Sequence, residues 1–232
     1  MHVFKSIVGA VLLLAASAPV AAAQDVPWPG TPGRYVFEVI RNGSAIGTQV
    51  VEIKQQGDTL IATTESKIAV KLLGLVVYRM HQVLTETYKG GRLVAISGET
   101  VDGNGKRLAE IARDGDHWTG HYNKEARAFD CDCSGSTMWH VSSMKTAMIE
   151  TSQGQLRHVT ITDHGMETLT LPEGKVQAHH FTVGGDLDRE VWYNASGNLV
   201  SAMQRGSDGS KIRQNLLSDP TAGTDVAPQA DD

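Results

Sequence analysis

The feature that most constrains the fold of this chain is an alternation of apolar and polar residues with period two, interrupted by glycine-containing turns, over most of residues 34–217. Such alternation predicts strands that bury one face. Asn42-Gly43 predicts a tight hairpin, because both central residues of a type I′ turn need a positive φ. Strands joined by turns this short pair with their neighbours. The pattern therefore predicts an all-β fold, mainly an antiparallel meander whose curled sheet forms a half-barrel or a barrel.

The turn signals divide the chain into thirteen expected strands. We expect them at residues 34–41, 45–56, 59–71, 75–89, 92–102, 106–114, 117–124, 157–163, 166–171, 175–183, 187–194, 198–205 and 210–217. A sheet with so many strands must close, curl or split into two layers to protect its edges. No segment repeats at a fixed period, so a propeller or a solenoid is not indicated.

One insert, at about residues 134–150, departs from this alternation and predicts the single short helix of the fold. Trp139, Met144 and Met148 approximate one apolar stripe at helical spacing. A helix of this kind would lie across the sheet as its closure, with these three side chains turned toward a ligand.

The two ends of the chain differ in composition from the domain. Residues 1–23 contain a short apolar run and an A-x-A site, which is typical of a secretory signal peptide and predicts a periplasmic or secreted protein. The run is too short to span a bilayer, so we expect no transmembrane segment in the mature chain. Residues 24–33 form a Pro-rich linker, residues 34–217 a single β domain, and residues 218–232 a disordered acidic tail.

Charge and motifs exclude several function classes. The formal net charge is −5 and no basic patch stands out, so we expect no nucleic-acid partner. The sequence contains no nucleophile elbow, zinc-protease helix, P-loop or dinucleotide fingerprint. We therefore expect a protein that is not an enzyme.

The insert is preceded by the only two cysteines, Cys131 and Cys133. In an oxidising compartment this pair predicts a local disulfide, a metal or redox pair, or free or intermolecular thiols, and the sequence leaves the three open. Soft thiolate and thioether ligands select Cu(I), so Cys131, Cys133, Met138 and His140 are candidate copper ligands. Apart from such a copper ion we expect no cofactor.

A second candidate site is the apolar cluster of residues 72–77, which includes Leu72, Leu73, Leu75 and Val77. The cluster is too short for a membrane helix. Its pattern is equally consistent with a buried strand crossing and with a patch that faces a ligand.

Several strand–turn–strand segments resemble a family of secreted proteobacterial β-sheet proteins of unknown function. The resemblance lies in residues 35–47, 88–95, 102–106, 190–200 and 208–210. It implies an antiparallel periplasmic β-sheet protein and no catalytic residue. The chain is more loosely similar to periplasmic lipoprotein carriers, in which a curled sheet closed by several helices holds an acyl chain.

These observations support three functional hypotheses. The first is a non-enzymatic periplasmic carrier for a small apolar, lipid-like molecule. The second is a copper or thiol-redox protein that acts through Cys131 and Cys133. The third is a structural or assembly factor that binds an envelope protein.

Overall fold

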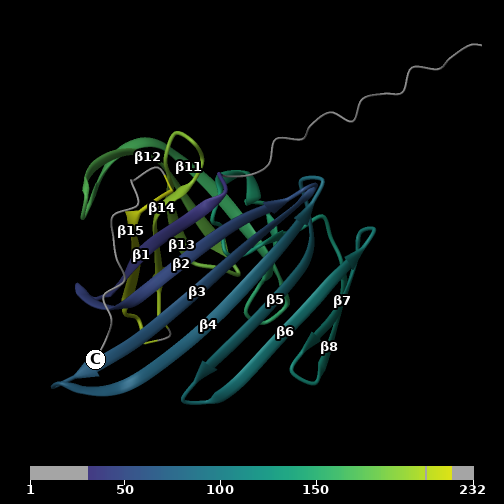
Figure 1. Ribbon diagram of the computed structural model, residues 1–232, viewed down its shortest axis with the longest axis horizontal. Helices are drawn as coiled ribbons and strands as arrows, with labels where there is room; N and C mark the ends of the chain where they lie inside the picture. The colour runs from purple at the N-terminus through teal and green to yellow at the C-terminus, as the bar shows by residue number, and fades with distance from the viewer. Residues whose placement is uncertain (1–30, 207, 221–232) are drawn as a thin grey trace, which may run out of the picture.

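The chain forms one 15-stranded sheet in the computed structural model, which describes residues 31–206 and 208–220 (Figure 1). The strands lie in the order β8-β7-β6-β5-β4-β3-β2-β1-β15-β14-β13-β12-β11-β10-β9. Their bounds are β1 Gly33–Arg41, β2 Ser44–Gln56, β3 Thr59–Leu72, β4 Leu75–Lys89, β5 Arg92–Asp102, β6 Gly105–Asp114, β7 His117–Tyr122, β8 Glu125–Asp130, β9 Ser134–Gly135, β10 Ala147–Glu150, β11 Gln155–Leu171, β12 Gly174–Gly185, β13 Arg189–Tyr193, β14 Leu199–Arg205 and β15 Lys211–Ser218.

The strand order is that of two meanders joined where β1 pairs with β15. Neighbouring strands are antiparallel, except that the short strand β9 runs parallel to β10. The Asn42-Gly43 hairpin is confirmed, since the two residues have φ of 49° and 85°. The predicted all-β class and the antiparallel meander are therefore confirmed.

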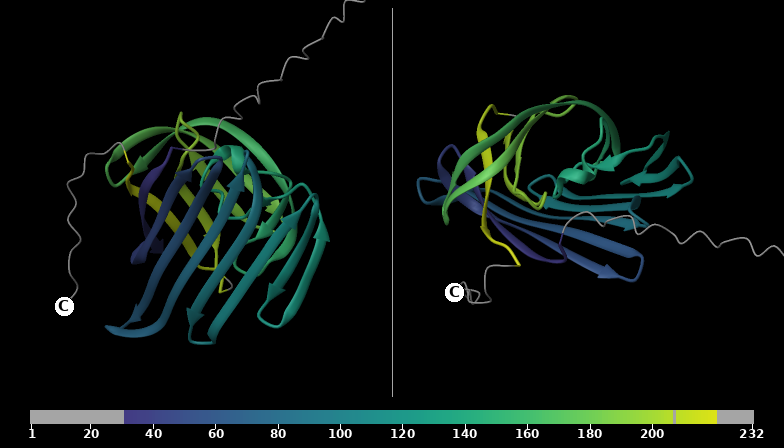
Figure 2. Two further views of the ribbon diagram at one scale, coloured as in Figure 1. Left: turned by 45° about the vertical axis from the view of Figure 1, so that its right-hand side comes forward. Right: turned by 90° about the horizontal axis from the view of Figure 1, so that it is seen from above.

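The sheet curls into an open roll instead of lying flat, and β11 and β12 arch over it (Figure 2). The end of the sheet that carries β9 and β10 turns inward and packs on the inner face of β4 and β5. Gly98 of β5 permits this approach, because an added Cβ would lie 2.6 Å from the carbonyl oxygen of Thr151. The two ends of the sheet thus overlap, and the inner face of β4 and β5 is covered.

The helix predicted at residues 134–150 is wrong. This segment contains β9, β10 and a single 3₁₀ turn, η1, at Val141–Ser143. The physical reason is that the segment crosses the interior and is buried on more than one side. Adjacent residues such as Met138 and Trp139 are both buried, at 1% and 3% exposure, which one helical stripe does not achieve.

The turn predicted at His164-Gly165 is also wrong. The strands expected at 157–163 and 166–171 are one continuous strand, β11, with a bulge between Asp163 and Gly165. A bulge uses the same positive φ of glycine as a turn does, here 77°, but it leaves the strand direction unchanged. The remaining expected strands lie within a few residues of the observed ones, and β8 was not anticipated.

The apolar core fills the closed end of the roll. Large side chains with 4% exposure or less gather there, and they include Tyr35, Phe37, Leu60, Tyr88, Ile96, Trp118 and Trp139. No helix in the described part of the chain is long and apolar enough to cross a membrane. The expected signal peptide and most of the expected linker and acidic tail lie outside the described residues. Ser218, the first residue assigned to the tail, ends β15.

Candidate functional site

Polar and apolar side chains alternate along the inner face of β4, from the core to the open end of the roll. Its inward-facing side chains follow in the order Tyr88, Glu86, Leu84, Gln82 and Met80, since alternate residues of a strand point to the same side. Tyr88 lies in the core, whereas Gln82 and Met80 line cavities. The site is therefore built along the strands, from the closed end of the roll to its open mouth.

A fully buried carboxylate, that of Glu86, marks the boundary between the core and the polar layer. It accepts hydrogen bonds from Tyr88 Oη at 2.7 Å, Trp139 Nε1 at 3.2 Å, the Thr137 backbone N–H at 3.2 Å and Thr151 Oγ1 at 3.0 Å. Burial and the neighbouring carboxylate raise the pKa of Tyr88 well above its ordinary value. Glu86 therefore joins β4 to the segment that packs across it.

Above this carboxylate lies a layer of amide and hydroxyl side chains. Gln214 Nε2 donates to Gln49 Oε1 at 3.0 Å, and Ser66 Oγ donates to the same oxygen at 3.1 Å. The same row continues across the sheet, since Gln82 pairs with Ser66 across β3 and β4, and Gln82 Nε2 donates to Thr100 Oγ1 at 2.9 Å. Four of these side chains occupy inward positions of the neighbouring strands β2 to β5 at the same level, so the polar layer is a built feature of the lumen.

An inner cavity of about 110 Å³ lies within this layer. Its lining includes Gln49, Gln214, Thr137, Met138 and Arg189. Arg189 Nη1 donates to the Ser136 carbonyl oxygen at 2.6 Å. Burial lowers the pKa of this guanidinium, which is nevertheless always charged at physiological pH. The cavity thus has a cation in its wall.

A second cavity, of about 610 Å³, opens at the mouth of the roll and shares Gln49, Gln82, Gln204, Ile212 and Gln214 with the inner one. Its apolar wall consists mainly of Val39, Ile46, Ile68, Val70, Met80 and Ile212. Two acids of the mouth, Asp102 and Asp208, are paired with Arg107 and Arg41. The mouth cavity therefore combines this apolar wall with amide and hydroxyl side chains and with neutralised charges.

Residues 72–77, here called the lip, form the tip of the β3–β4 hairpin beside this mouth cavity. Leu72, Leu73, Leu75 and Val77 are 63%, 96%, 72% and 59% exposed. The alternative of a buried strand crossing is therefore wrong, because the hairpin extends beyond the neighbouring strands into solvent (Figure 1). Val77 also lines the mouth cavity, so the lip and the cavity wall are continuous.

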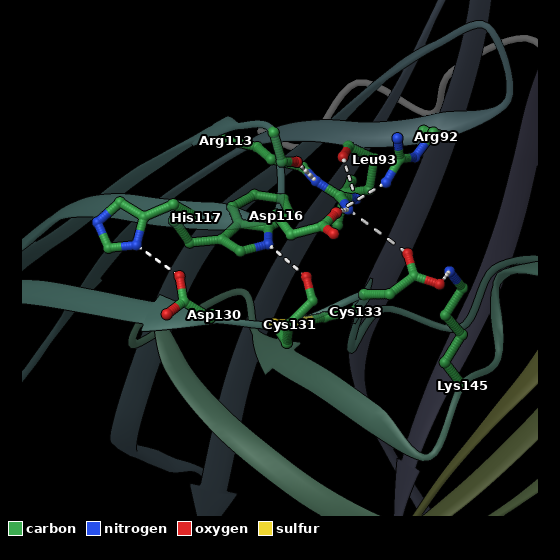
Figure 3. The surroundings of a disulfide bond; sticks show 12 residues. Arg92, Leu93, Arg113, Asp116, His117, Asp130, Cys131, Cys133 and Lys145 are labelled. Atoms are coloured by element: carbon green, nitrogen blue, oxygen red, sulfur yellow. Dashed lines mark hydrogen bonds and ion pairs between the residues drawn. A yellow bond between two sulfur atoms is a disulfide. The ribbon is translucent and has the colours of Figure 1, made fainter.

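Cys131 and Cys133 lie against each other in the connection between β8 and β9, with Cα atoms 5.2 Å apart (Figure 3). This separation is within the range that a disulfide spans. The Cys131 carbonyl oxygen accepts from Trp118 Nε1 at 3.1 Å, and Cys133 is only 1% exposed. Between them, Asp132 pairs with Lys145 at 2.7 Å, which lowers the pKa of Asp132. The pair is thus set into the wall of the fold, and its disulfide remains a prediction.

The other two candidate copper ligands have different surroundings. His140 Nδ1 accepts from the Ser142 backbone N–H at 3.1 Å, and Nε2 contacts the Ser196 carbonyl oxygen at 3.1 Å. Both imidazole nitrogens are therefore engaged, while Met138 is buried. Within residues 31–206 and 208–220, no group of three or more His, Cys, Asp or Glu side chains could hold a metal ion.

The remaining predicted ligand-binding residues pack in or against the core. Trp139 and Met148 are 3% and 0% exposed, and Met144 packs partly buried against the same cluster. They line neither cavity. Sequence reasoning missed Glu86 and Arg189, although their signal was present: each is a charged residue at an inward position of an alternating strand.

Two of three comparisons with known proteins found a match, and both agree with this fold. A domain of unknown function, DUF6134, matches residues 37–217. The crystal structure of a beta-barrel-like protein of domain of unknown function DUF1849 from Brucella abortus is similar, with a TM-score of 0.62 and 10% identity. That alignment covers 81% of this chain and 96% of that chain, and at this identity it shows the fold alone. No curated protein matches the sequence. The predicted membership in a β-sheet family of unknown function is thus confirmed, and the chain belongs to the DUF6134 family.

Proposed function

We propose that this protein is a non-enzymatic binding protein or carrier that holds a lipid-like molecule in the mouth cavity. The location we propose is the periplasm or the exterior of the cell, on the basis of the signal-like residues 1–23. The observation that carries the proposal is the continuity between the apolar wall of the mouth cavity and the exposed lip.

The lip supports this proposal because folding does not account for it. Leu73 has a φ of 51° and is followed by Gly74 with a φ of 82°. In this left-handed region a bulky residue is strained, and a two-residue hairpin favours Asn at that position. A fully exposed, strained leucine contributes nothing to the core, whereas it does offer apolar surface to a lipid at the cavity entrance.

The direct test is the binding of a fluorescent long-chain fatty acid, together with native mass spectrometry of protein taken from its native compartment. We expect saturable binding and a co-purifying adduct of lipid mass. Ile68→Gln, in the cavity wall, should weaken binding roughly tenfold because it replaces a half-buried aliphatic group that would contact the ligand. Its matched control is Lys67→Gln, one residue away on β3 with a side chain that is 66% exposed, which should bind as the wild type does.

The Leu73→Asn variant tests the contribution of the lip separately from that of the cavity. It should leave the free energy of unfolding unchanged or slightly higher, because Asn suits the turn, while it slows uptake of the fatty acid from vesicles. A clean apo mass and no fatty-acid binding by the wild type would overturn the proposed function.

A further inference from the structure

The guanidinium of Arg189, in the wall of the inner cavity, forms no ion pair within the described part of the chain. Arg189 begins β13, lines the inner cavity, and donates only to the Ser136 carbonyl oxygen. An arginine carries five N–H donors in a planar fork, so most of them are left for another acceptor. Arginine in this state is suited to bind a carboxylate or a phosphate.

The nearest carboxylates are committed elsewhere. Those of Glu86 and Glu150 attract the Arg189 guanidinium electrostatically. Glu86, however, accepts its four hydrogen bonds from other groups, and Glu150 pairs with Arg157. Neither carboxylate forms a hydrogen bond or an ion pair with Arg189, so the fork stays open toward the cavity.

A second polar group in the same wall lacks a partner. Thr137 Oγ1 is buried and has no hydrogen-bond partner, and Thr137 lines the inner cavity with Arg189. Buried polar atoms are nearly always hydrogen-bonded, so an orphaned hydroxyl in the same cavity wall as an open cation supports a bound group there. A cavity of about 110 Å³ has room for several waters or for one carboxylate or phosphate group.

We propose that the inner cavity binds the anionic head group of a single-chain amphiphile, with Arg189 and Thr137 as its donors. The hydrocarbon chain then runs outward through the mouth cavity, along Ile68 and Met80, toward the lip. Two acids of the mouth are already paired with arginines, so they oppose an entering anion only weakly. The inference rests on the proposed function and adds to it the chemistry and orientation of the ligand.

The test compares a long-chain fatty acid with the alcohol of the same chain length, each displacing the same fluorescent fatty acid. The wild type should bind the acid roughly tenfold to a hundredfold more tightly, which is the range of a charge-assisted hydrogen-bonded pair. Arg189→Gln should remove this preference and leave the affinity for the alcohol unchanged. Arg205→Gln is the matched control, because Arg205 is 63% exposed and pairs with Asp188 outside the cavity lining.

Each outcome decides between the two proposals. If neither amphiphile binds, the proposed function fails and this inference fails with it. If the wild type binds acid and alcohol equally, the proposed function stands and the head-group site is wrong; this comparison needs no variant. If Arg189→Gln does not fold, Arg189→Lys, which keeps the charge and loses the fork, should retain part of the preference, and an unreduced preference would overturn the site. If inorganic phosphate displaced the fluorescent fatty acid as effectively as the long-chain fatty acid does, a ligand with a hydrocarbon tail would be excluded.

Discussion

Replacing Glu86 by Gln tests whether one buried carboxylate holds the overlapping ends of the sheet together. Glu86 is 0% exposed, and its oxygens divide four donors between them. Oε1 accepts from the Thr137 N–H and Thr151 Oγ1, and Oε2 accepts from Tyr88 Oη and Trp139 Nε1. Three of these donors belong to the segment that crosses the inner face of β4.

The expected loss of stability depends on which of the four donors can adapt to a neutral amide in place of the carboxylate. The hydroxyls of Tyr88 and Thr151 can rotate and accept from the new amide group. The Thr137 N–H and the Trp139 indole N–H can only donate, and they contact different oxygens of Glu86. Either orientation of a glutamine therefore turns its NH₂ group toward one fixed donor. We expect a loss of about 2–4 kcal/mol, from one unsatisfied buried donor and weaker hydrogen bonds to a neutral acceptor.

The measurement is urea denaturation followed by circular dichroism and tryptophan fluorescence. Glu99→Gln is the control: that side chain, on β5, is 46% exposed and pairs with Lys106, so its loss should stay within about 0.5 kcal/mol. A loss below about 1 kcal/mol for Glu86→Gln would refute the reasoning, since a single unsatisfied buried donor costs at least that much.

Three further predictions concern other parts of the fold. Gly135→Ala should destabilise the protein by about 1–3 kcal/mol in the same assay, because the new Cβ would lie 1.9 Å from the buried carboxylate beneath it; wild-type stability would contradict this packing. Titration with a thiol reagent should find no thiol in the unreduced, unfolded protein and two after reduction, whereas two without reductant would contradict the pairing of Cys131 with Cys133. Hydrogen bonds from Arg107 lower the pKa of Asp102 from 3.8 to about 2, so Arg107→Gln should return it toward 3.8 in an NMR titration. A depressed carboxyl pKa stabilises the folded state above the unfolded value, so this contribution should fade as the pH falls from about 4 toward 2.

The strands could be predicted because their signals are local. The strand expected at 75–89 is β4, and the one expected at 92–102 is β5, residue for residue. Each is bounded by a glycine turn, and alternation between turns determines which side chains face inward. No long-range information is needed for such a meander.

The candidate site could be predicted only in part, because it depends on how far the sheet curls. The apolar lip was identified from residues 72–77, but its exposure depends on how far β3 and β4 extend beyond their neighbours. Met138 and Trp139 lie on a chain segment that is enclosed by the roll, and this enclosure produced the misleading helical pattern. Arg189 and Gln82 come from strands far apart in the sequence, so their common cavity cannot be inferred from either strand alone.

The distribution of polar residues along the lumen separates stability from binding. The dry core ends at Glu86, and a roll built only for stability could end its strands there. Instead β3 and β4 continue through an amide layer to an apolar mouth and finish at a strained, exposed leucine. A polar layer between two apolar regions costs stability unless its groups are paired. Here Thr137 Oγ1 has no partner, and the Arg189 guanidinium donates only to the Ser136 carbonyl oxygen. The same order of surfaces, apolar outside and cationic within, matches an amphiphile that enters head first.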